Sequence, residues 1–322
     1  MFLKKNKKYN MNTFIKFTAY IFILLGFCGC NSGIFIDDFE PSVSELTLDG
    51  NGDEAVIRFS GSDWNILDIP VFEQNNIKVY DAAGNLINGQ LYLDRLGKIV
   101  YNGTMVSFTI EGINSKEVKV AVDENVQVYP FQFLLIASNE YESREIHITI
   151  SPSDRYVFDR ITYSLNAYSY DEPVIEKANM RFDNSLASTE AIYHFFPYKN
   201  EYHNVMFKSD DPEAFRLLAN SDLLIDIPTI EKGEMGMNGK KAQYVSQLQK
   251  LPLPFSDEEK KDVVVKPHTV SHIIGKVQYE WFETKYTLYA THPKTGKKRT
   301  ITGMMQSSIP KNYNIKREDT KD

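Results

Sequence analysis

Cysteine is almost absent from this chain of 322 residues, and the two that occur are Cys28 and Cys30. Both close the N-terminal segment, where we expect one to be removed with that segment and the other to be modified. The rest of the chain then has no disulfide and no thiol chemistry. Its stability must come from hydrophobic cores, and its length is sufficient for two domains.

Long apolar runs are also missing. The run from Phe17 to Leu25 is much shorter than the roughly 20 residues that a membrane-spanning helix needs. Small residues follow it, and five lysines precede or begin it: Lys4, Lys5, Lys7, Lys8 and Lys16. This order is typical of a secretory signal, so we expect residues 1–29 to be removed.

Basic residues are in deficit. The chain has 36 Lys and Arg against 43 Asp and Glu, and loss of the N-terminal lysines makes the remainder more acidic still. Nucleic acids and anionic lipid surfaces both require clustered Lys and Arg. Neither is therefore expected as a general partner.

Motifs for catalysis or metal binding are lacking as well. His268 and His272 have the spacing of a helical zinc pair, but Pro267 and the β-branched residues around them indicate a strand, where four residues span about 13 Å. No Gly-x-Ser-x-Gly elbow, phosphate loop or dinucleotide fingerprint occurs. We expect a non-enzyme without metal or cofactor.

Two acidic patterns have simpler explanations. Asp49, Asn51 and Asp53 alternate as at the start of an EF-hand loop, but the required glycine is missing, so a hairpin turn explains them. Three acidic pairs are expected in solvated turns or helix caps rather than in a glycosidase cleft: Asp37/Asp38, Asp210/Asp211 and Glu258/Glu259.

What the chain does contain is a series of short alternating segments separated by turns. Asn102-Gly103 lies between two β-rich segments and predicts a hairpin with a type I′ turn. Acid-capped residues 210–218 predict one short helix, and residues 225–248 a long hairpin near Asn238-Gly239. The expected fold is all-β, with two β-sandwich-like domains, the second elongated and antiparallel.

The expected boundaries follow from these turns. We assign residues 1–29 to the signal peptide, 30–40 to a tether, 41–152 to an immunoglobulin-like sandwich and 153–315 to a C-terminal β domain. The charged residues 316–322 are expected to be a disordered tail.

Aromatic residues are densest from Ile273 onward, and there the apolar alternation changes phase between Trp281 and Phe282. A phase change predicts a bulge or a break, because a one-residue slip turns every side chain to the other face. If the strand lies at an edge, exposed rings could stack on a sugar. The candidate ligand site is Tyr279, Glu280, Trp281, Lys285 and Tyr286; an ordinary sheet core with one bulge explains the same pattern.

The end of the leader, Gly26-Phe27-Cys28-Gly29-Cys30, resembles a bacterial lipobox. Gly29 matches the small residue before the lipidated cysteine, whereas Phe27 and Cys28 depart from the usual Leu and Ala or Ser, so cleavage before Cys28 stays open. The resemblance implies a lipid anchor (palmitate) at Cys30. It also implies a cell-envelope, outer-membrane lipoprotein, surface-exposed as in Bacteroidetes.

Residues 41–151 resemble the BACON family of Bacteroidetes carbohydrate-associated modules. The resemblance rests on Ser44–Leu48, Val56–Phe59 followed by Gly61-Ser62-Asp63-Trp64, Val118–Asn125, Phe133–Ile136 and Arg144–Ile150. It implies an immunoglobulin-like β-sandwich that binds carbohydrate or acts as a spacer. Ser151-Pro152 stands where the family usually has Gln.

Residues 182–315 resemble the elongated β domains of aerolysin-type proteins. The residues concerned are Val263–Val270, Tyr286–Tyr289, Thr295-Gly296 and Ile301–Gly303. In those toxins a Ser/Thr-rich hairpin becomes the pore. The corresponding segment here, 225–248, is short and rich in Gly, Met and Lys.

Together these features predict a lipid-anchored, non-catalytic envelope protein that binds a glycan or another surface or host ligand. Two alternatives stay open: an adhesin-type assembly component, and an aerolysin-like membrane-active protein. Exposed aromatic residues would favour ligand binding, a long unpaired edge strand would favour assembly, and a detachable amphipathic hairpin would favour membrane activity.

Overall fold

A computed structural model describes residues 39–68, 76–87 and 96–321. The expected signal peptide, Cys30 and nearly all of the tether lie outside these residues. The chain is all-β, as predicted, and the expected short helix is a 3₁₀ helix, η2 (Pro212–Arg216), capped by the Asp211 side chain. None of the helices in the described part is long and apolar enough to cross a membrane.

The N-terminal strands form two sheets that enclose one core. The first has the order β1 (Glu45–Leu48), β10 (Ser143–Ile150), β9 (Phe131–Ser138), β3 (Asn65–Asp68). The second has the order β2 (Asp53–Arg58), β8 (Glu117–Asn125), β7 (Val106–Asn114), β6 (Lys98–Asn102), β4 (Ile77–Tyr80), β5 (Leu86–Ile87). Phe108 and Phe133 stack between them with ring centroids 4.6 Å apart, and Trp64 is buried.

The predicted β6–β7 hairpin is confirmed, but its turn is not type I′. Asn102 pairs with Ser107, and neither Asn102 nor Gly103 has a positive φ. The connection is therefore longer than the two residues that the Asn-Gly pair suggested. Close packing favours glycine at position 103 instead, since a Cβ there would lie 3.1 Å from the Val106 carbonyl oxygen.

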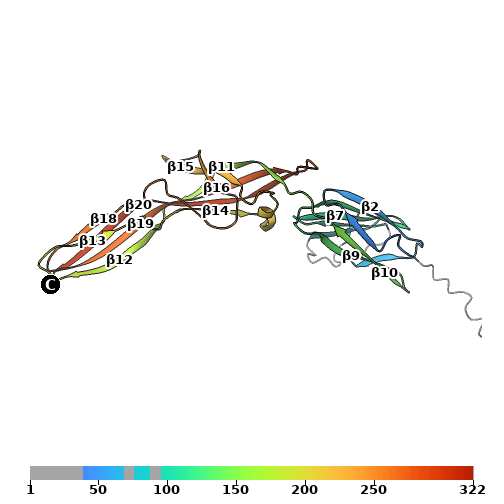
Figure 1. Ribbon diagram of the computed structural model, residues 1–322, viewed down its shortest axis with the longest axis horizontal. Helices are drawn as coiled ribbons and strands as arrows, with labels where there is room; N and C mark the ends of the chain where they lie inside the picture. The colour runs from blue at the N-terminus through green and yellow to red at the C-terminus, as the bar shows by residue number, and fades with distance from the viewer. Residues whose placement is uncertain (1–38, 69–75, 88–95, 322) are drawn as a thin grey trace, which may run out of the picture.

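The second part of the chain is organised by two very long strands, β19 (Thr269–Thr291) and β20 (Lys298–Lys321), which pair along their whole length. β20 is flanked by β14 (His203–Ser209), and β14 by β17 (Gln249–Leu251). On the other side of β19, β11 (Val157–Asp171) pairs with one half and β12 (Val174–Asn184) with the other. The result is a narrow, extended sheet that continues away from the sandwich (Figure 1).

Two small two-stranded sheets cover this long sheet. One pairs β13 (Ala191–Phe195) with β18 (Lys261–Val265), and the other pairs β15 (Leu224–Glu231) with β16 (Glu234–Gln243). Odd-numbered residues of β19 are buried from 269 to 279, and even-numbered residues from 280 to 290. Because successive side chains of a strand point to opposite faces, the two covers lie on opposite faces of β19.

The bulge predicted between Trp281 and Phe282 does not lie in β19: this strand continues without an extra residue, and a bulge lies nearby on its partner β20. The register of β19 and β20 shifts between Gln278 and Tyr279, where Lys311 is the additional residue on β20. The shift coincides with the change of cover. The phase change in the sequence therefore reports a change of packed face within a central strand, not an exposed edge.

The C-terminal residues correct an expectation. Residues 316–321, expected to be disordered, continue β20 and pair with the start of β19, from Ile274↔Lys316 to Thr269↔Lys321. Their charges are compatible with a strand because they lie along a sheet edge, where alternate side chains are solvated.

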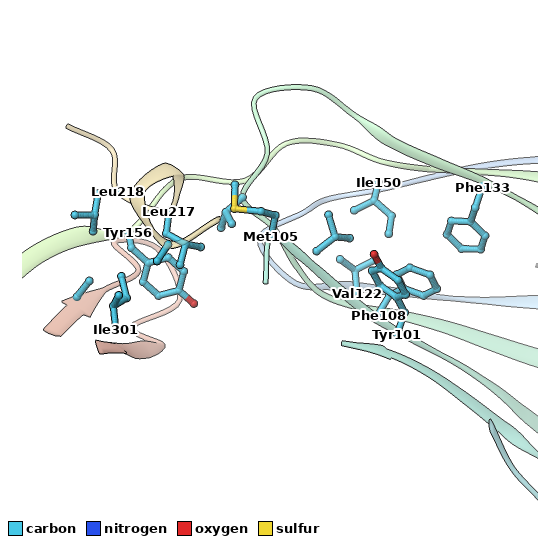
Figure 2. Close-up of a cluster of buried hydrophobic side chains, with 14 of the residues drawn as sticks. Tyr101, Met105, Phe108, Val122, Phe133, Ile150, Tyr156, Leu217, Leu218 and Ile301 are labelled. Atoms are coloured by element: carbon cyan, nitrogen blue, oxygen red, sulfur yellow. The ribbon is translucent and has the colours of Figure 1, made fainter. Parts of the chain in front are cut away.

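The two parts meet at a joint that is apolar at its centre and ionic at its side. Figure 2 shows Met105 of the sandwich between its own core and the side chains of Tyr156, Leu217 and Leu218. Beside them, Glu124 of β8 accepts hydrogen bonds from the Tyr156 hydroxyl at 2.6 Å and the Lys297 ammonium at 3.0 Å, and pairs with Arg299.

Burial opposes the charged form of Glu124, yet the Tyr156 hydrogen bond and the Arg299 and Lys297 charges hold its pKa below the usual value. Burial, together with the same carboxylate, raises the pKa of Tyr156 to about 12. The carboxylate therefore stays ionised and its partners stay protonated at neutral pH.

Replacing Glu124 by Gln should lower the free energy of unfolding by about 3 kcal/mol at pH 7, because two cations at the joint lose their buried partner. A carboxylate with a depressed folded pKa adds stability above its unfolded pKa and loses it as the pH falls through the folded value. The difference from wild type should thus shrink in acid. Urea unfolding at pH 7 and pH 3 measures both effects.

The matched control is Asp49→Asn, which removes an exposed ion pair with Lys294 across the same joint, at 3.3 Å. Its expected cost is below about 1 kcal/mol. Equal costs for Glu124→Gln and Asp49→Asn would contradict a buried ionic joint.

Candidate functional site

The five candidate ligand residues do not form one exposed surface. Tyr279, Glu280 and Tyr286 are buried, with 4%, 4% and 1% of their surface exposed, whereas Trp281 is half-buried and Lys285 exposed. The aromatic platform expected from the sequence is thus absent, because β19 is a central strand with neighbours on both sides. Ligand binding by these residues stays an untested prediction.

The two tyrosines belong to different hydrophobic clusters. The Tyr279 hydroxyl donates to Glu201 at 2.7 Å, and the Lys177 ammonium pairs with Glu201 at 2.5 Å. Tyr286 belongs to the other cluster, where its hydroxyl is 3.0 Å from that of Tyr244. The candidate residues are therefore divided between two cores at the point where the packed face changes.

The cover formed by β15 and β16 is a hairpin that, apart from Leu224, lies within the segment 225–248 singled out in the sequence. Its turn lies at Lys232 and Gly233, both with positive φ (53° and 84°), which is the requirement of a type I′ turn. The predicted turn residue Gly239 also has a positive φ, 74°, but lies in an irregular part of β16. The segment contains two X-Gly pairs, and Lys232-Gly233, not the predicted Asn238-Gly239, forms the turn.

The hairpin is amphipathic. Its buried face carries Ile225, Ile227, Ile230, Met235 and Ala242. Its exposed face is largely polar, with Asp226, Glu231, Lys232, Glu234 and Lys241. Hairpins of this pattern bury one face against a core and expose the other.

No ladder hydrogen bond joins the hairpin to the long sheet among the described strands, because β15 and β16 form a sheet of their own. Side-chain hydrogen bonds assist the apolar packing. The Tyr163 hydroxyl donates to the Asp226 carbonyl oxygen at 2.9 Å, and the Tyr244 and Tyr286 hydroxyls meet. The Gln249 side chain of β17 also accepts from the Gln243 N–H and donates to the Gln243 carbonyl oxygen, each at 2.8 Å. The hairpin is thus held mainly by its apolar face.

A cavity of about 360 Å³ lies between this hairpin and the long sheet, within the size range of small-molecule sites. The hairpin and the sheet each contribute to its walls, which are lined by Thr229, Ile230, Glu231, Asn238, Lys240, His203, Glu280, Phe282, Ser307, Ile309, Pro310 and Lys311, with Pro254 and Phe255 from a loop. Glu280 is neutralised there by Lys311, 2.5 Å away.

His203 is the one histidine of this cavity wall. It is almost fully buried, and its Nε2 lies 2.8 Å from the Ser307 hydroxyl oxygen. Burial, and then the nearby charge of Lys240, lower its pKa to about 4. The ring is therefore neutral at physiological pH. Sequence analysis missed His203 and Lys240 because β14, β16 and β20 meet only in the folded chain.

No group of three or more metal-ligating side chains lies together in the part of the chain that the structure describes. His268 precedes β19 in a turn, with a positive φ of 56°, while the His272 ring contacts Asn179. The two histidines are thus used in separate local contacts.

No family model matches this chain, and no curated protein matches it. Among solved structures, it is similar to the lamprey immune protein, with a TM-score of 0.36 and 10% identity over 84% of this chain and 99% of that chain. It is also similar to an aerolysin-like protein of Bombina maxima, with a TM-score of 0.27 and 13% identity over 50% of this chain and 97% of that chain.

The printed name of the second protein is of the aerolysin type, the type that the C-terminal part was found to resemble, but a likeness at this score carries no argument for that resemblance. The BACON and lipoprotein resemblances find no support among these comparisons. At such low scores the likenesses carry no conclusion about activity.

Replacing His203 by Gln should flatten the acid dependence of stability. Between its unfolded pKa near 6.5 and its folded pKa near 4, the unfolded chain binds a proton that the folded chain does not, so the wild type loses stability as the pH falls. At pH 4.5 this loss amounts to about 2–3 kcal/mol, which the variant should not show. Urea unfolding at pH 7 and 4.5 measures it.

His147→Gln is the control, because His147 is exposed on β10. That variant should follow the wild-type pH dependence. An unchanged acid dependence in His203→Gln would show that His203 is not kept neutral by burial.

Proposed function

We propose that this is a membrane-active β protein whose β15–β16 hairpin leaves the long sheet and enters a lipid bilayer. The observation that supports this most directly is the hairpin's attachment: an amphipathic two-stranded unit packed on the sheet through apolar side chains, without a shared ladder. Its release would break few hydrogen bonds and would leave the long sheet paired.

The other two-stranded cover is a poorer candidate for release. β13 and β18 belong to segments far apart in the chain, so they cannot leave as one hairpin. The Phe195 ring also packs so closely over Gly275 that a Cβ there would lie 2.6 Å from it.

Energetics favour a docked hairpin in water. Exposing Ile225, Ile227, Ile230 and Met235 would cost about 6–12 kcal/mol, at about 1.5–3 kcal/mol for each large apolar side chain. A hydrocarbon environment removes that cost, because the same side chains are again out of water. The hairpin should therefore open at a bilayer and not in solution.

The length of the hairpin is adequate when its flanks are included. β15 and β16 have 8 and 10 residues, and a membrane-spanning strand needs about 9–11. One apolar residue extends the buried face at each end, Leu223 before β15 and Tyr244 after β16. A lipid anchor at Cys30, in a protein of the cell envelope, is part of the same proposal, since it would hold the hairpin near a membrane.

The test uses the chain from Asn31 onward, which retains every described residue and removes the apolar leader. Met237→Cys, exposed on β16, carries an environment-sensitive fluorophore. With phospholipid vesicles we expect a blue shift and protection from aqueous quencher at position 237, together with release of trapped dye.

Leu186→Cys, on a fully exposed turn between β12 and β13, carries the same fluorophore as a control and should stay quenchable. Equal quenching at both positions, with intact vesicles, would refute hairpin insertion. Protection at both positions would indicate adsorption of the whole protein to lipid.

A further inference from the structure

We propose that the cavity between the β15–β16 hairpin and the long sheet binds a small amphiphilic anion, with an apolar chain against the cavity wall and an anionic head group at Lys240. The proposal concerns binding in the absence of any membrane and does not require that the hairpin insert.

The walls fit an apolar body. The apolar residues that line the cavity are Phe282, Ile309 and Pro310 from the sheet, Ile230 from the hairpin, and Pro254 and Phe255 from a loop. Ligand sites are commonly cavities of about 300–1,000 Å³ with mostly apolar walls and a few polar groups, which describes this one.

The charged residues that line the cavity indicate which ligand head group would bind there. Glu280 and Lys311 neutralise each other at 2.5 Å, and Glu231 is exposed at the hairpin turn, where water solvates it. Lys240 is half-buried and forms no ion pair with any residue that the structure describes. A partly desolvated ammonium without a counter-ion favours a carboxylate, sulfonate or phosphate monoester beside it.

His203 and Lys240 line the same cavity. Burial is the main reason for the low pKa of His203, and the charge of Lys240 lowers it further. The neutral ring adds no second cation there. An anion bound at Lys240 would cancel part of this field and raise the pKa of His203.

The cavity is shared between elements that touch only when the hairpin is docked. A ligand inside it therefore stabilises the docked state through mass action. A bound amphiphile would therefore oppose release of the hairpin at a membrane. This consequence, unlike the binding itself, rests on the proposed function.

The experiment titrates the whole chain with octanoate, 1-octanol and octylammonium, which share one apolar chain and differ in head-group charge. Isoleucine-methyl NMR signals of Ile230 and Ile309, assigned with Ile→Val variants, report on the cavity itself. We expect both signals to shift with octanoate, and octanoate to bind more tightly than octanol and much more tightly than octylammonium.

Lys240→Met keeps the apolar stem and removes the charge, so the octanoate Kd should rise about tenfold, the loss expected for one charge-assisted hydrogen bond. Lys240→Arg should retain binding. The matched control is Lys241→Met, the next residue on β16, which is exposed and faces Asp226 at 3.8 Å. Lys241→Met should leave the octanoate Kd unchanged. Neither Lys240→Met nor Lys241→Met should change the octanol Kd.

Equal affinities for octanoate and octylammonium, an equal loss in Lys241→Met, or shifts that avoid Ile230 and Ile309 would each overturn the proposal. The titration contains no vesicles, so its failure is distinct from a failure of hairpin insertion. Conversely, cavity binding with no insertion would leave this inference standing and refute the proposed function alone.

Discussion

The continuous pairing of β19 with β20 is the constraint on which the rest of the molecule depends. The ladder runs from Thr269↔Lys321 to Thr291↔Lys298 with one shift of register. Such a narrow sheet is not wide enough to bury either of its faces by itself. Each half of it is therefore covered by a two-stranded sheet from elsewhere in the chain. The covers lie on opposite faces, and the apolar alternation of β19 must change phase where one ends and the other begins.

The sequence revealed this phase change but not its cause. Periodicity in β19 showed that buried and exposed positions exchange near Trp281. The fixed period of a strand led to a predicted bulge in β19, whereas the extra residue, Lys311, lies on β20. Whether β19 lies at an edge or at the centre depends on partners such as β11, more than a hundred residues away. Local pattern contains no information about that pairing, so the exposed platform around Tyr279 and Tyr286 could not be distinguished from a core.

The candidate hairpin was predicted as a segment, and its details were not. Lys232-Gly233 and Asn238-Gly239 both offer a residue pair that tolerates positive φ, and the register that buries Ile225, Ile227 and Met235 together decides between them. The cavity could not be predicted from the sequence, for a stronger reason. His203, Lys240 and Lys311 come from three separate strands, and their proximity is a property of the tertiary fold alone.

The joint and the hairpin are held by opposite kinds of interaction, which suggests different mechanical roles. At the joint, Glu124 combines a hydrogen bond with two cations beside a continuous apolar core, so the sandwich and the β19–β20 turn should move as one body. The hairpin relies on non-directional apolar contacts, which another apolar environment can replace. The joint would therefore hold the sandwich and the long sheet in a fixed relative position, while the hairpin stays free to detach.

A released hairpin would meet one further physical requirement. In hydrocarbon, every backbone N–H and C=O group needs a partner within the protein, and only helices and closed barrels satisfy this condition. β15 and β16 pair with each other, but their outer edges would be unpaired. A single inserted hairpin is therefore not a stable end state. On the proposed function, stable insertion requires hairpins from several copies to pair edge to edge until the sheet closes, with the long sheets and sandwiches remaining outside the bilayer.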